Sequence, residues 1–80
     1  MTRVIVDTTW TTKEIRKLIG SKVEEAFIDS GEHYVHYIHA VPLKIIQATM
    51  KTEDGITIGA VLLENGSGIA FARVILELAE

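Results

Sequence analysis

The segment ITIGAVLLE, residues 56–64, carries apolar side chains at both odd and even positions, and this restricts the folds open to the chain more than any other feature. In a β-strand, Ile56, Ile58 and Leu62 would lie on one face of the sheet, and Val61 and Leu63 on the other. The segment LKIIQATM, residues 43–50, also carries large apolar side chains at both parities. Antiparallel sheets with a wet face normally alternate apolar and polar residues. Each such side chain left in water forgoes about 1.5–3 kcal/mol relative to burial, so both faces of this sheet are expected to be covered.

The residues that follow the first strand predict an amphipathic helix that begins after Thr11 and ends before Gly31. Thr11 and Glu14 have the spacing of a capping box, and Trp10 and Ile15 occupy the positions of a hydrophobic staple. Gly31 suits a left-handed C-terminal cap. The apolar residues recur at helical spacing and form one stripe, which contains Ile15, Leu18, Ile19, Val23, Ala26 and Phe27.

The remaining segments favour strands. Residues 3–8, 33–41, 43–52 and 56–64 are rich in β-branched or aromatic residues, with Pro42 expected to stop or bend the chain. Asp54-Gly55 and Asn65-Gly66 have the sequence of tight hairpin turns. Residues 68–80 fit either a strand that is apolar on both faces or a helix, and the preceding Asn-Gly favours the strand.

The predicted fold is therefore α+β, with one amphipathic helix packed on a mostly antiparallel sheet in the order β-α-β-β-β-β. The alternative, with a terminal helix, is β-α-β-β-β-α. Eighty residues make a single domain over 1–80. One helix covers only one face of a sheet, so a second copy of the chain is expected to cover the other face in a dimer or larger symmetric oligomer.

The stretch HYVHYIHA, residues 33–40, holds all three histidines and both tyrosines. In an extended strand, His33 and His39 lie about 20 Å apart, so the strand alone does not bring them together around one metal ion. The sequence is nearly palindromic about His36, so antiparallel pairing with a second copy would place His36 opposite itself and His33 opposite His39. Such an interface would weaken as the histidines become charged near about pH 6. The candidate self-association or partner surface is His33, Tyr34, His36, Tyr37 and His39.

Charge is unevenly distributed along the chain. The net charge is −3, but residues 1–22 carry five cations against two acids, and residues 23–80 carry three cations against nine acids. Two contact faces follow as candidates. The basic one consists of Lys13, Arg16 and Lys17, and the acidic one consists of Glu53, Asp54 and Glu64. With no uniformly basic footprint, nucleic-acid binding is expected to be at most weak and to use the start of the helix.

No catalytic or nucleotide-binding motif is present, and no cofactor or metal is expected. The chain has no cysteine, no signal peptide and no apolar run long enough for a membrane span, so a cytoplasmic location is the expectation. The sequence favours a small, non-enzymatic, self-associating protein-binding module, an accessory protein or inhibitor of the kind that phages and mobile elements encode. An oligomer that binds a small molecule in a cleft between subunits, lined by Trp10, Tyr34, Tyr37 and the histidines, is the alternative.

Overall fold

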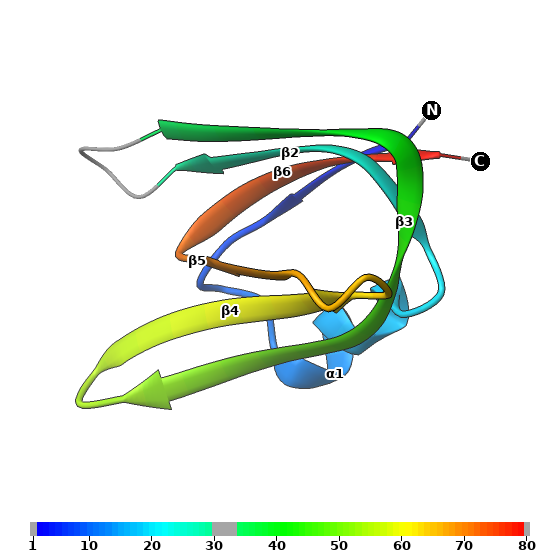
Figure 1. Cartoon of the computed structure of the whole chain (residues 1–80). Coiled ribbons are helices and arrows are strands. Elements are labelled where there is room, and N and C mark those ends of the chain that lie inside the picture. The colour runs from blue at the N-terminus through cyan, green and yellow to red at the C-terminus, as the bar shows by residue number, and fades with distance from the viewer. Residues whose placement is uncertain (1, 30–33, 80) are drawn as a thin grey trace.

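The computed structural model describes residues 2–29 and 34–79, and for residues 34 and 38–40 it describes only the backbone. These residues form a small protein that is dominated by an antiparallel sheet and has one short helix (Figure 1). The elements in chain order are β1 (Thr2–Val6), α1 (Thr12–Ile15), the 3-10 turn η1 (Arg16–Leu18), β2 (Lys22–Asp29), β3 (Tyr34–Glu53), β4 (Ile56–Leu63), β5 (Gly68–Phe71) and β6 (Arg73–Ala79). The strands lie in the order β1-β6-β2-β3-β4-β5.

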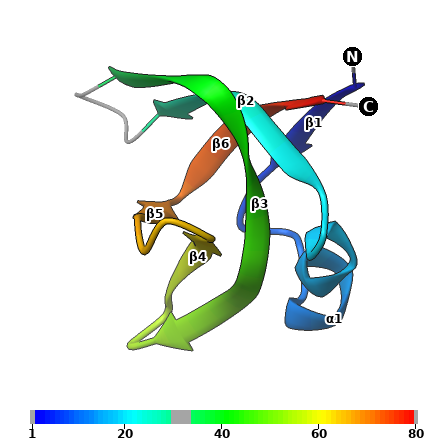
Figure 2. The same ribbon diagram turned by 45° about the vertical axis from the view of Figure 1, so that its right-hand side comes forward.

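The strand β3 is shared by two layers. Its first part pairs with β2, and its second part, from Ile45, pairs with β4. Because β3 bends between these parts, the layer of β1, β6, β2 and the start of β3 lies over the layer of β4, β5 and the end of β3 (Figures 1 and 2). The buried side chains of both layers form one apolar core, which includes Val23, Leu76, Ile45, Val61 and Phe71. The sheet thus covers its own inner face, a task that the sequence analysis assigned to the helix.

The helix is much shorter than predicted. The capping box is confirmed, since the Thr11 side chain accepts a hydrogen bond from the Glu14 N–H and the Glu14 side chain accepts one from the Thr11 N–H. The helical segment ends at Leu18, and Gly20 then adopts a φ of +97°, a conformation that glycine enters at little cost. Residues 22–29, predicted as helix, are the strand β2. The predicted cap at Gly31 lies outside the described residues.

A β-bulge explains why β2 has the sequence spacing of a helix. The pairing of β2 with both of its neighbours shifts register between Val23 and Glu25. Such an extra residue reverses the alternation of faces, so Val23 and Ala26 are both fully buried although they stand three positions apart. Beyond the bulge the ordinary alternation returns, and Ile28 is again buried. The bulge therefore imitates the spacing of a helical stripe.

Three further predictions are settled by the strands. The two strands predicted on either side of Pro42 are one continuous strand, β3. The terminal helix is wrong, because residues 68–79 form β5 and β6, which are separated at Ala72. The order is accordingly β-α-β-β-β-β-β, one strand more than predicted. The Asp54-Gly55 turn is confirmed: both residues have positive φ, 52° and 78°, and they join β3 to β4. Within the described residues, no helix has the length and apolar character needed to cross a membrane.

Candidate binding surfaces

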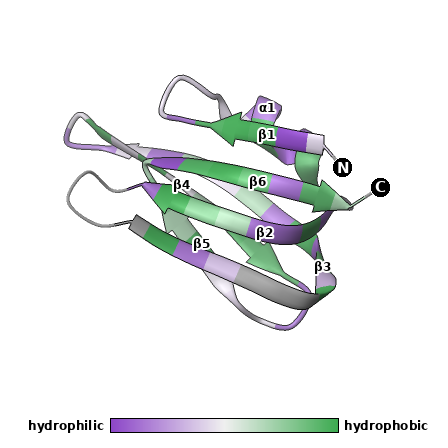
Figure 3. Cartoon of the chain, turned by 90° about the horizontal axis from the view of Figure 1, so that it is seen from above, coloured by the Kyte–Doolittle hydropathy of each residue, from purple (hydrophilic) through white to green (hydrophobic). Residues whose placement is uncertain are grey.

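The first part of β3 has one free edge. Residues 34–38 and Leu43 pair with β2 on one side, whereas the register passes over residues 39–42; on the other side no described strand pairs with residues 34–43, because the register with β4 starts at Ile45. Figure 3 shows this part of β3 at the margin of the upper layer. Residues 34–43 include no lysine, arginine, aspartate or glutamate, and Val41 is 72% exposed. Charged side chains are a common protection of sheet edges against pairing with another chain, and this edge has none.

His36 lies in this edge strand, on the outer face of the sheet. It is the cross-strand partner of Phe27, and the two rings stack with their centroids 4.1 Å apart and their planes at 13°. The His36 Nε2 lies 3.2 Å from a Glu25 carboxylate oxygen. Phe27 is in turn the partner of Ile75, and Ile75 the partner of Ile5. His36 is therefore the last member of a row of cross-strand partners that crosses all four strands of the upper layer. The contacts with Phe27 and Glu25 fix the orientation of its ring.

Of the other residues of the predicted self-association surface, the structure describes the side chain of Tyr37 alone. Tyr37 follows His36 in the strand, so its side chain is on the opposite face, where it is partly exposed. Tyr34 and His39 lie in β3, and only their backbone is described; His33 lies outside the described residues. Trp10, proposed for a cleft between subunits, is half-buried against the core. Within the described ranges, no three potential metal ligands come together.

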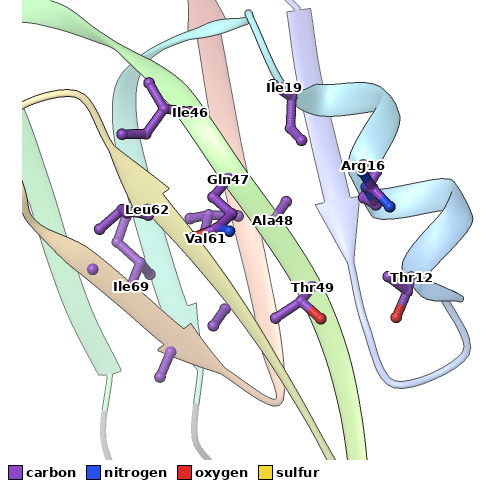
Figure 4. A pocket seen from close by; sticks show the side chains of 13 residues that line it. Thr12, Arg16, Ile19, Ile46, Gln47, Ala48, Thr49, Val61, Leu62 and Ile69 are labelled. Atoms are coloured by element: carbon purple, nitrogen blue, oxygen red, sulfur yellow. The ribbon is translucent and has the colours of Figure 1, made fainter.

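A shallow groove lies on the outer face of the other layer (Figure 4). Its volume is about 920 Å³. Two rows of cross-strand partners make its floor, Thr49, Ala60 and Ala70 in one row and Gln47, Leu62 and Gly68 in the next. Alanine and glycine have small side chains, so the floor of the groove is lower than its surroundings. Ile46 and the helical segment form the sides of the groove. The groove is a direct result of small residues on β4 and β5.

The helical segment supplies Thr12, Arg16 and Ile19 to this groove. Their spacing of four and three residues places them along one side of a helical turn. Thr12 also fastens this segment to β3, because its hydroxyl donates to the Met50 carbonyl oxygen at 2.9 Å and accepts from the Met50 N–H at 3.2 Å. Of the predicted basic face, Arg16 thus lines the groove. Lys13 and Lys17 are exposed on the same segment outside the lining.

The outer face of β4 continues the groove as an apolar strip. Ile56, Ile58, Ala60 and Leu62 are alternate residues of β4 and share this face. Ile56 is 65% exposed and Ile58 49% exposed. The two-faced pattern seen in the sequence therefore corresponds to a buried inner face and an outer face that no described element covers.

The predicted acidic face is divided between the two ends of β4. Glu53 ends β3 and Asp54 begins the β3–β4 turn, and a Glu53 carboxylate oxygen lies 3.7 Å from the Lys51 Nζ. Glu64 follows the other end of β4, and its carboxylate accepts a hydrogen bond from the Lys44 N–H at 3.2 Å. A strand of this length separates the two groups by about 20 Å, so they would contact different parts of a partner.

The ionisable groups lie at the surface. Among the described residues, no polar or charged residue is buried. The Asp7 carboxylate accepts hydrogen bonds from the Thr9 hydroxyl and the Thr9 N–H, and these lower its pKa from the usual 3.8. This arrangement is typical of a turn that follows a strand.

Comparisons with protein-family models, with curated proteins and with solved structures find no match for this chain. The candidate surfaces therefore rest on the structure itself. The strand of His36 and the outer residues of β4 are predictable from the sequence. The groove is not, because Arg16 and Ala70 come together only through the pairing of β3, β4 and β5.

Proposed function

We propose that this chain is a small, non-enzymatic module that works by binding other protein chains, and that its first partner is a second copy of itself. The free edge of β3 over residues 34–43 is the observation that carries this proposal. An exposed edge offers a row of backbone donors and acceptors to another strand. A module of this kind acts as an accessory protein or an inhibitor when its further partner is an enzyme.

The sequence of the edge favours a second copy as its partner. In YVHYI, residues 34–38, the tyrosines and the β-branched residues are interchanged about the central His36. Antiparallel pairing on a two-fold axis through His36 would set Tyr34 opposite Ile38 and Val35 opposite Tyr37. Aromatic residues opposite β-branched residues are favourable cross-strand pairs. The two upper layers would then join into one continuous sheet, and the apolar row ending at His36 would continue into the row of the partner.

The surroundings of the charged groups support a binding role over a catalytic one. Catalytic acids and bases usually sit in a cleft with strongly shifted pKa values, where burial and a nearby charge act together. Among the described residues, the shifted carboxylate, Asp7, is only partly buried and accepts hydrogen bonds within a turn. The groove of the lower layer has Arg16 as its one ionisable lining residue.

Sedimentation equilibrium of the wild-type chain and of His36→Lys tests the proposal. Lysine places two like charges opposite each other on the two-fold axis, and we expect the dimer to dissociate at least about fivefold more readily. Thr8→Lys adds the same charge in an exposed turn and should leave the dimer unchanged. A wild-type chain that remains monomeric throughout the micromolar range would refute the proposal. Equal dimerisation of both variants would place the interface elsewhere.

A further inference from the structure

The groove on the lower layer combines an apolar floor with a single cation. Its floor and sides are formed mainly by alanine, glycine, leucine and isoleucine, together with the uncharged polar residues Thr12, Gln47 and Thr49. Arg16 is the only charged residue in the lining. No acidic side chain faces the guanidinium from the lining, so no lining residue offsets its positive charge.

The Arg16 guanidinium has no hydrogen-bond or ion-pair partner within the described part of the chain. The other two arginines contrast with it: the Arg3 Nε donates to a Glu77 carboxylate oxygen at 2.6 Å, and the Arg73 Nη1 lies 4.0 Å from an Asp29 carboxylate oxygen. An arginine presents a planar fork of donors that suits a carboxylate. The donors of the Arg16 guanidinium are therefore available to a ligand, and they lie beside an apolar surface.

The apolar floor indicates what else the partner carries. From the groove, the outer face of β4 runs on through Ile58 to Ile56, which gives an apolar strip about 20 Å long, or about six residues of extended chain. Isolated exposed apolar residues are ordinary, but a continuous strip beside a groove marks an interaction site. We propose that this groove binds an apolar peptide segment of another protein that carries an acidic side chain, with the carboxylate on Arg16 and the apolar side chains on the floor.

The lining favours a peptide over a nucleic acid. Single-stranded nucleic acids are held by aromatic side chains on which the bases stack, and the lining contains no aromatic residue. A phosphate backbone would also use Lys13 and Lys17, which are exposed next to Arg16, whereas a single carboxylate needs only Arg16. The two ligand classes therefore differ in which cations they depend on.

Fluorescence anisotropy with labelled peptides separates these cases. The probes are a short peptide of leucine and glutamate, the same peptide with glutamine at each glutamate, and an oligouridylate. We expect the glutamate peptide to bind the wild-type chain about three- to tenfold more tightly than the glutamine peptide, which is the range of a partly exposed charge-assisted contact. In Arg16→Gln this preference should disappear, whereas in Lys17→Gln it should persist.

A second variant tests the apolar floor without touching the charge. Ala70 is exposed, so Ala70→Leu fills the groove with little risk to folding, and it should weaken both peptides by a similar factor. Three results would overturn the proposal. One is no binding of the glutamate peptide, and another is a glutamate preference that survives in Arg16→Gln. The third is tighter binding of the oligouridylate than of the peptide, with Lys17→Gln as harmful as Arg16→Gln, which would assign the site to nucleic acid. Because these variants lie away from the β3 edge, the outcome is independent of dimerisation there.

Discussion

The ring of Phe71 lies against Gly59, its partner on the neighbouring strand, and occupies the space that a side chain at position 59 would need. A Cβ built on Gly59 would stand 2.5 Å from the Phe71 Cε2 and 2.8 Å from the Met50 Sδ. Such distances are far below van der Waals contact, and both neighbours belong to the packed interior of the lower layer. Glycine at this position is therefore required by packing, since its φ is ordinary.

Gly59→Ala should consequently destabilise the fold by about 1–3 kcal/mol, the usual cost of overpacking a core. Urea unfolding followed by circular dichroism measures this difference. Gly68→Ala is the matched control, because a Cβ there would meet only the Val61 carbonyl oxygen, at 3.9 Å. An equal loss in both variants would show that chain flexibility, rather than the Phe71 ring, sets the cost.

Thr12→Val tests how the helical segment is held on β3. The Thr12 hydroxyl serves both the N–H and the carbonyl of Met50, so valine keeps the shape but removes both hydrogen bonds, at a cost of about 1–2 kcal/mol in the free energy of unfolding. Thr57→Val removes a hydroxyl that is 2.8 Å from the Thr52 hydroxyl on an exposed strand pair, and should cost less. If the two variants were equally stable, the Thr12 contact would not fasten the segment.

The Asp7 carboxyl should titrate below 3.8, because its charged form accepts hydrogen bonds from Thr9. Its pKa in the folded chain is lowered from the unfolded value, so its contribution to stability is complete above the unfolded pKa and is lost as the pH falls through the folded pKa. NMR titration of the carboxyl carbon measures the midpoint. In Thr9→Ala, which lacks the hydroxyl, the midpoint should rise towards the ordinary value; an unchanged midpoint would exclude the hydroxyl as its main cause.

The sequence predicted local features well wherever one residue type decides the geometry. Thr11 and Glu14 form the capping box, and Asp54-Gly55 forms the hairpin turn. The two-faced character of residues 56–63 was also correctly assigned, with Val61 and Leu63 buried inside and Ile56 and Ile58 exposed outside.

The prediction failed where a long-range contact decided between alternatives. The spacing of Val23 and Ala26 fits a helical stripe as well as a bulged strand, and pairing with β3 and β6 selects the strand. Pro42 was expected to stop or bend a strand; β3 runs through Pro42 and bends before its β4-paired part (Figure 1), and neither the register with β2 nor that with β4 gives Pro42 a partner at this edge. Proline is tolerated at such an edge because no hydrogen bond of a neighbouring strand depends on its missing N–H.

The way in which the inner face of the sheet is covered shows why the groove on the lower layer was not predicted. The sequence indicated that both faces of the sheet need cover, and a helix and a second copy were the expected sources. In the structure, the bend in β3 turns the two halves of the sheet towards each other. This leaves the outer faces of the two layers, rather than one whole face of the sheet, for partners. Pro42 indicated a stop or a bend, but the proline alone does not distinguish the two or show which faces the bend brings together.

Amide hydrogen exchange at low and high protein concentration tests the central claim, that the free edge of β3 pairs with another copy, most directly. Alternate amides of residues 34–38 point away from β2, and pairing should slow their exchange as the concentration rises. The amides on the outer edge of β1, the margin of the same layer on the other side, provide the internal control and should exchange at a constant rate. Protection of the β3 amides that grows with concentration, and is lost in His36→Lys, is the predicted result. Exchange at these amides that is fast and independent of concentration would contradict the claim.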